Sequence, residues 1–164
     1  MLFRSYRIGW MIVSGNKRLG SDFMLGVNML SNMRLCSNVP AQSIVQTALG
    51  GHQSVKDYVA PGGRVYEQRN YVYEALNAID GITAVKPKAA FYIFPKMDVK
   101  KFNIHDDEQF ALDLLHQKGI LITRGGGFNW PEPDHFRIVY LPRMGVLREA
   151  MEDLAEFFET YRQA

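Results

Sequence analysis

The chain has 164 residues, of which 47% are hydrophobic and 22% are charged, a composition typical of a folded protein rather than a disordered one. Lysine and arginine total 19 against 17 aspartate and glutamate residues, an excess too small to favour a nucleic-acid partner. The single cysteine, Cys36, excludes an internal disulfide and a cysteine metal cluster. Because no apolar run reaches membrane-spanning length, we expect no membrane partner and a cytoplasmic location.

The first sixty residues carry one apolar strand and two helices. Residues 8–13 are apolar on both alternating faces, which predicts a strand covered on both sides in the middle of an α/β sheet. Periodic apolar residues predict a helix over 18–36 and a second over 40–49, with Pro40 at its start. A domain rarely begins with a buried central strand, so we expect residues 1–60 to be the C-terminal remnant of a large α/β domain.

The remaining residues, 61–164, predict a connecting helix and a small α+β domain. Pro61-Gly62-Gly63 precedes a long amphipathic helix that ends at Gly81. The predicted elements after it are strands at 82–85, 90–94, 120–123 and 136–141, a helix from 106 to 119, and a last helix with Leu147, Met151, Leu154, Phe158 and Tyr161 on one face.

Arg137 is the first candidate for a binding residue. It lies in a strand with apolar residues on both sides, where an unpaired guanidinium would cost several kcal/mol. Its planar fork matches a carboxylate or phosphate with two parallel hydrogen bonds. A structural ion pair, or an edge position that reaches water, is the alternative. Arg7, just before the first apolar strand, raises the same question, with a solvated terminal arginine as its alternative.

Other polar features are weaker candidates. Residues 125–127 are three glycines without the spacing of a phosphate-binding loop, so a flexible loop is the better interpretation. The aromatic, proline-containing loop 128–135 leads into Arg137 and could line a pocket or cap the core. The four histidines (His52, His105, His116 and His135) are widely spaced, which predicts surface or loop positions and no metal site.

Several long blocks resemble one family. Residues 6–10 are similar to the segment after the cofactor lysine in class I aminotransferases, the fold-type I pyridoxal-phosphate enzymes. Residues 33–42, 61–69 and 90–95, and the run Phe128-Asn129-Trp130-Pro131-Glu132-Pro133-Asp134-His135, resemble the bacterial alanine (glutamate–pyruvate) aminotransferases within it. The resemblance covers residues 6 to about 162 and implies a fold-type I α/β architecture.

The resemblance also implies roles for both arginines. Arg7 matches the arginine that holds the phosphate of pyridoxal 5'-phosphate, and Arg137 matches the one that binds the substrate α-carboxylate. The implied reaction moves an amino group between alanine and 2-oxoglutarate, in a protein that is a homodimer at full length. No metal is implied.

One departure from the family concerns the Schiff-base lysine. In the family it lies eight residues before the phosphate arginine, which would place it before Met1, and no lysine in this chain stands in the required context. We therefore expect a C-terminal fragment that is inactive alone and whose residues 1–5 are non-native. Two alternatives stay open: another class I aminotransferase (aromatic or broad-range) or a carbon–sulfur lyase, and a non-catalytic truncated binding module.

Overall fold

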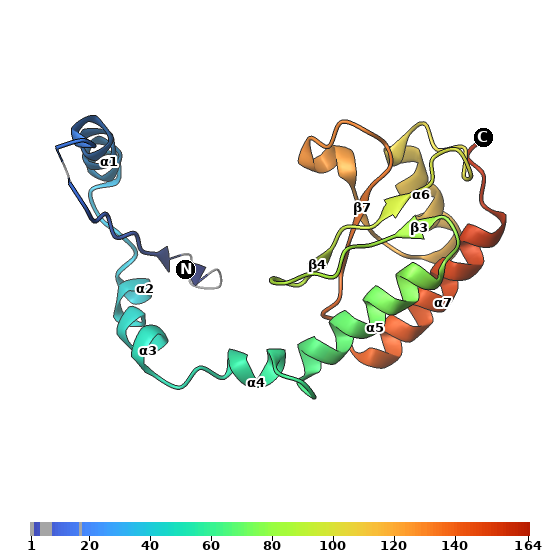
Figure 1. Cartoon of the computed structure of the whole chain (residues 1–164), viewed down its shortest axis with the longest axis horizontal. Helices are drawn as coiled ribbons and strands as arrows, with labels where there is room; N and C mark the ends of the chain where they lie inside the picture. The colour runs from blue at the N-terminus through green and yellow to red at the C-terminus, as the bar shows by residue number, and fades with distance from the viewer. Residues whose placement is uncertain (1, 4–7, 17) are drawn as a thin grey trace. The chain divides into compact units, whose positions relative to one another are not determined.

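A computed structural model describes residues 2–3, 8–16 and 18–164. The chain divides into two compact units, Met1–Gln53 and Ser54–Ala164. The first unit contains β1 (Leu2–Phe3), β2 (Ile8–Gly9), α1 (Ser21–Arg34), α2 (Val39–Ser43) and α3 (Val45–Gly50), shown in Figure 1. The division falls just before α4 (Val55–Val59), which packs against α5 (Arg64–Ala78), whereas the boundary expected from the sequence follows residue 60.

The first unit differs from its prediction in two elements. The strand expected over 8–13 is confined to Ile8–Gly9, which pairs antiparallel with Leu2–Phe3. The single helix expected over 40–49 is two short helices, α2 and α3, which meet at Ile44. The Asn38 side chain begins α2 by accepting a hydrogen bond from the Ala41 N–H at 3.2 Å, which satisfies one of the free donors at a helix start.

Most apolar side chains of the described residues 8–53 are uncovered. Met11 is 61% exposed and Ile12 83% exposed, so the described residues of this chain do not cover the two faces that a complete α/β domain is expected to bury. Met11 and Ile12 lie beyond the end of β2, so within the described part of the chain no strand ladder places a neighbour beside them. Helix α1 has no buried residue, and Ala41 is the one buried hydrophobic residue in this described part. These residues do not build a core of their own.

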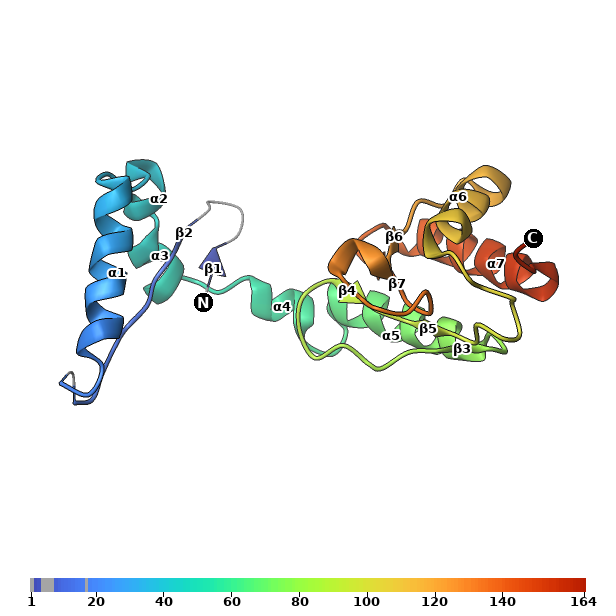
Figure 2. The same cartoon turned by 90° about the horizontal axis from the view of Figure 1, so that it is seen from above.

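The second unit, Ser54–Ala164, combines helices with short antiparallel strands. After α4 and α5 its elements are β3 (Ile82–Thr83), β4 (Tyr92–Ile93), β5 (Lys96–Met97), α6 (Asp107–Lys118), β6 (Thr123–Arg124), the 3₁₀ helix η2 (Gly125–Phe128), β7 (Phe136–Val139) and α7 (Met144–Thr160). An antiparallel sheet has the order β4-β7-β6, and β3 pairs with β5. Helices α5 and α7 lie side by side, and α6 packs on β6 and α7 (Figures 1 and 2).

The strands of this unit are shorter than the sequence indicates. Ala90 has a φ of 63°, a left-handed conformation that extended chain cannot contain, and β4 starts only at Tyr92. The strand expected over 120–123 is observed at Thr123–Arg124, so Thr123 is the one residue of the expected range that pairs with β7. Strand β5 has no counterpart in the prediction, and the glycine run forms η2 instead of a flexible loop.

The core lies between the sheet and helices α5, α6 and α7. The predicted face of the last helix is confirmed, because Leu147, Met151, Leu154, Phe158 and Tyr161 are all buried. Phe110 of α6 is at its centre and packs against the rings of Phe136, Phe157, Phe158 and Tyr161. No helix among the described residues is long and apolar enough to cross a membrane.

A buried tyrosine makes the stability of this unit depend on alkaline pH. The Tyr161 hydroxyl donates to Asp113 Oδ2 at 2.7 Å, and burial together with this carboxylate raises the pKa of Tyr161 well above its ordinary value. The folded state therefore keeps the phenol neutral, while the unfolded chain ionises it above about pH 10. Stability from this group is complete below that pH and is lost as the pH rises further.

Urea unfolding of Tyr161→Phe between pH 8 and 11 should show a smaller alkaline loss of stability than wild type, whereas Tyr58→Phe, at an exposed tyrosine, should lose as much stability as wild type. An equal alkaline loss in Tyr161→Phe and wild type would contradict the assignment.

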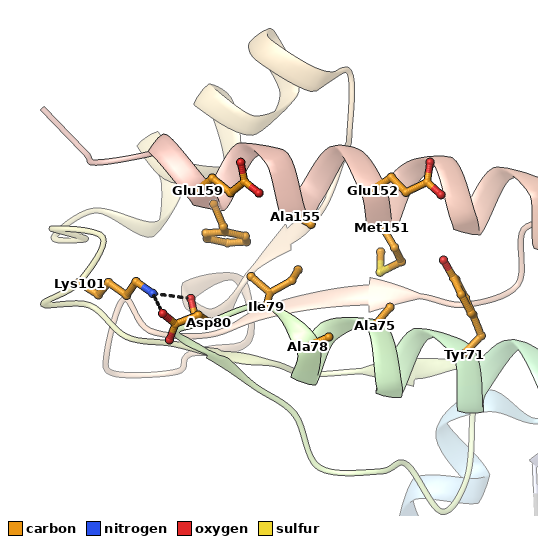
Figure 3. A pocket seen from close by; sticks show the side chains of 11 residues that line it. Tyr71, Ala75, Ala78, Ile79, Asp80, Lys101, Met151, Glu152, Ala155 and Glu159 are labelled. Atoms are coloured by element: carbon orange, nitrogen blue, oxygen red, sulfur yellow. Dashed lines mark hydrogen bonds and ion pairs between the residues drawn. The ribbon is translucent and has the colours of Figure 1, made fainter.

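A hollow of about 580 Å³ lies between α5 and α7 (Figure 3). Ala75, Ile79 and Met151 line it, and at one end the Lys101 ammonium pairs with Asp80 at 2.5 Å. Arg137 is not among its lining residues. The hollow is therefore separate from the site described below.

Candidate functional site

Arg137 lies on β7, the central strand of the β4-β7-β6 sheet. Its neighbour Phe136 is fully buried in the core. Because successive side chains point to opposite faces of a strand, Arg137 lies on the other face, where it is half-buried and directly opposite Thr123 of β6. The central position removes one of the sequence-based alternatives, since Arg137 is not on an edge strand.

The guanidinium of Arg137 is held by two aromatic rings and one weak hydrogen bond. Its Cζ lies 4.5 Å from the ring centroid of Tyr92 and 4.6 Å from that of Phe128. One Nη atom donates to Thr123 Oγ1 at 3.4 Å. The Nε atom is buried and has no hydrogen-bond partner among the residues that the structure describes. No carboxylate of the described residues lies within ion-pair distance, so a structural ion pair is not found in that part of the chain.

The structure leaves Arg137 available to an anion. A buried donor without an acceptor costs about 1–3 kcal/mol, and more when it is charged. An incoming carboxylate can accept from Nε and one Nη in parallel, which is the geometry that a guanidinium favours. The rings of Tyr92 and Phe128 would shield this ion pair from water.

Asp134, the acidic residue nearest to Arg137 along the chain, is engaged elsewhere. Its Oδ1 accepts from Trp130 Nε1 at 2.8 Å and contacts His135 Nδ1 at 2.6 Å, and its Oδ2 lies 3.3 Å from Lys96 Nζ. Burial acts to raise the pKa of Asp134, but the hydrogen bonds from His135 and Trp130 outweigh it and lower the pKa below its ordinary value. Asp134 therefore stays ionised and does not neutralise Arg137. His135, predicted at a surface or loop position, is the last residue of the aromatic loop and is largely buried because it joins this cluster.

A second carboxylate fixes the start of the aromatic loop. Asp107, at the beginning of α6, accepts from the Gly126 N–H at 2.6 Å and from Arg124 Nη1 at 3.2 Å. This interaction holds η2, whose last residue is Phe128. The glycine run is thus part of the frame around Arg137 rather than a phosphate-binding loop.

Two of these glycines should respond differently to substitution. A Cβ at Gly125 would lie 2.7 Å from the His135 carbonyl oxygen, whereas at Gly127 the nearest atom would be 3.6 Å away. We expect Gly125→Ala to lower the free energy of unfolding by about 1–3 kcal/mol, as for other overpacked sites. Gly127→Ala should change it by less than about 0.5 kcal/mol. Chemical denaturation of both variants tests this, and equal effects would contradict the packing described for η2.

The two arginines predicted from the sequence have different outcomes. Arg137 is brought together with Thr123, Tyr92 and Phe128. Arg7 lies outside the described residues. Sequence reasoning missed Tyr92 and Thr123 as neighbours of Arg137, because only the register of the sheet places them there.

Comparison with known proteins identifies the family. Residues 5–156 match the family model for aminotransferase class I and II. The chain belongs to this family. It is 54% identical over 158 residues to the glutamate-pyruvate aminotransferase AlaA of Haemophilus influenzae, a match that covers 96% of this chain and 39% of that protein. It is 52% identical to the alanine aminotransferase of Mycobacterium tuberculosis, covering 96% of this chain and 37% of that protein.

The fold agrees with this assignment. A crystal structure of an aminotransferase from Escherichia coli superposes with a TM-score of 0.90 and 49% identity, over 99% of this chain and 40% of that one. The chain therefore has the architecture of part of a fold-type I aminotransferase, as the sequence predicts. It spans about two fifths of the length of the relatives that it matches.

Proposed function

We propose that this chain provides the substrate-carboxylate site of a pyridoxal-phosphate-dependent aminotransferase that moves an amino group between alanine and 2-oxoglutarate. The observation that carries the proposal is the guanidinium of Arg137, which lies on a central strand between two rings and has a buried Nε without an acceptor in the described part of the chain. The names of the relatives support the alanine–glutamate assignment.

A single arginine can serve both halves of such a reaction. Alanine and 2-oxoglutarate both carry a carboxylate next to the reacting carbon, so Arg137 would bind each by the same two hydrogen bonds. Fixing that carboxylate fixes the orientation of the reacting bond, which is the main contribution that binding residues make to rate. Pyridoxal phosphate, when bound, supplies the electron sink for the chemistry. Arg7 would hold its phosphate.

Four further parts of the proposal concern the domains, the activity of the chain alone, the assembly and the location of the full-length protein. Residues 1–60 would belong to the large cofactor-binding domain, in agreement with their uncovered apolar side chains, and residues 61–164 to the small domain. The Schiff-base lysine would not be among these residues, so the chain alone would not turn over. The full-length protein would be a homodimer located in the cytoplasm.

A chimera tests the proposed reaction. The matched 158 residues of this chain would replace the corresponding segment of the Haemophilus influenzae relative, which supplies the remaining part of an aminotransferase. We expect the chimera to form pyruvate from alanine and 2-oxoglutarate, and to use alanine better than aspartate or phenylalanine. The controls are this chain alone and the relative's remaining part alone, both expected to be inactive.

Two outcomes would contradict the proposal. A folded chimera that binds pyridoxal phosphate but transfers no amino group would contradict the aminotransferase function and favour a binding module. Preference for an aromatic donor, or release of pyruvate and ammonia from a sulfur-containing amino acid, would contradict the alanine assignment and favour the other class I enzymes.

A further inference from the structure

We propose that Asp134 is a positioning residue, which fixes the aromatic loop 128–135 so that Phe128 covers the guanidinium of Arg137. The consequence for substrate binding rests on the proposed function, but the positioning itself does not. Asp134 does not contact Arg137. It acts through the aromatic side chains of Trp130, His135 and Phe94, and Phe94 in turn contacts Phe128.

The first step is the fixed charge of Asp134. The residue is 7% exposed, and an ionised carboxylate at such a site must be matched by donors. Trp130 and His135 supply two donors from within the loop, and Lys96 supplies a third from β5. The carboxylate thus ties Trp130, in the middle of the loop, to the segment that leads into β7.

The second step is the packing of Phe94 against the members of this cluster. Its ring stacks on His135 with centroids 4.9 Å apart and meets Trp130 edge-on at 5.7 Å. The same ring meets Phe128 edge-on at 6.1 Å. Phe94 therefore links the residues that Asp134 holds to the ring that lies over Arg137.

The third step is the effect on the guanidinium. Phe128 lies over Arg137 at 4.6 Å, and the other ring, that of Tyr92, belongs to a strand and does not depend on the loop. Loss of the Asp134 hydrogen bonds would release Trp130, and with it the support of Phe128. Arg137 would then be open to water on the side of the loop, and a bound carboxylate would be held less firmly.

Ring-current shifts in NMR spectra of the 164-residue chain without substrate measure directly whether the Phe128 ring lies over Arg137. An aromatic ring over Arg137 shifts its δ-methylene protons upfield, and Phe128→Leu gives the reference value without that ring. We expect Asp134→Ala to move the Arg137 δ shift at least half of the way to this reference. Asp134→Asn should stay near wild type, because an amide oxygen still accepts from Trp130 and the exposed Lys96 pair contributes little. Glu132→Ala, at an exposed carboxylate of the same loop, is the matched control and should equal wild type.

The methyl shifts of Ile93 and Leu154, both in the core, show whether each variant is folded. A wild-type Arg137 shift in folded Asp134→Ala would overturn the proposal. If Asp134→Ala fails to fold, Trp130→Phe tests the proposal instead, because it removes only the indole donor and keeps a ring. A movement of the Arg137 shift toward the reference value supports the role of Asp134. An unchanged Arg137 shift overturns the proposal. Because no turnover is measured, failure of amino transfer in the chimera would leave this result unaffected.

Discussion

Replacement of Arg137 by lysine is expected to lower the kcat/KM of the chimera for alanine by about a hundredfold or more, close to 3 kcal/mol at 1.4 kcal/mol per factor of ten. Lysine keeps the positive charge, but it cannot donate two parallel hydrogen bonds to one carboxylate. Among the described residues Thr123 is the one hydrogen-bonding neighbour of Arg137, so no second side chain there replaces the lost hydrogen bonds to the carboxylate. Steady-state kinetics with alanine and 2-oxoglutarate provide the measurement.

A matched control separates binding from folding. Arg148 is exposed on α7, so Arg148→Lys makes the same chemical change away from the site and should leave kcat/KM unchanged. Retention of pyridoxal phosphate by Arg137→Lys, followed by its absorbance, should also match the parent chimera. Turnover near the parent value in Arg137→Lys would mean that this residue only supports the structure, and that its proposed role is wrong.

Replacement of Phe110 by alanine is expected to remove about 3–5 kcal/mol from the free energy of unfolding, as for other large-to-small core substitutions. Phe110 is 0% exposed and packs against four aromatic rings from β7, α7 and the residue that follows α7. Its loss would leave a cavity at the point where α6, the sheet and α7 meet. Urea denaturation monitored by circular dichroism measures the change.

Two variants make the result interpretable. Leu112 lies on the same helix but is 42% exposed, so Leu112→Ala should cost less than about 1 kcal/mol. Because folded domains have only about 5–15 kcal/mol of stability, Phe110→Ala could leave too little folded protein to measure. Phe110→Leu would then give a smaller loss that still exceeds the Leu112→Ala value. Equal losses at positions 110 and 112 would contradict the described core.

The helices of the second unit could be predicted from the sequence because their burial follows a simple period. The last helix buries every residue that its apolar stripe indicates, and α6 begins at an acidic cap and ends at Gly119 as expected. The strands could not be bounded in the same way. The left-handed backbone at Ala90 depends on the tertiary path of the chain, and no pattern in the sequence marks it.

The candidate site could be predicted only in part. Arg137 is conspicuous in the sequence because a charged residue interrupts an apolar strand. Its neighbours Tyr92 and Phe128 come from another strand and from η2, and only the sheet register and the fixed loop bring them to it. The role of His135 was missed for a similar reason, since its burial depends on the adjacent Asp134 and on Phe94.

The most direct test of the central proposal is a crystal structure of the chimera with pyridoxal phosphate and 2-oxoglutarate. The quantity to measure is the distance from Arg137 Nε and its nearest Nη to the substrate carboxylate oxygens. We predict two distances of about 2.7–3.1 Å, the range of charge-assisted hydrogen bonds, with Phe128 and Tyr92 still over the guanidinium. A structure in which other residues bind every substrate carboxylate, while Arg137 Nε still lacks an acceptor, would contradict the account.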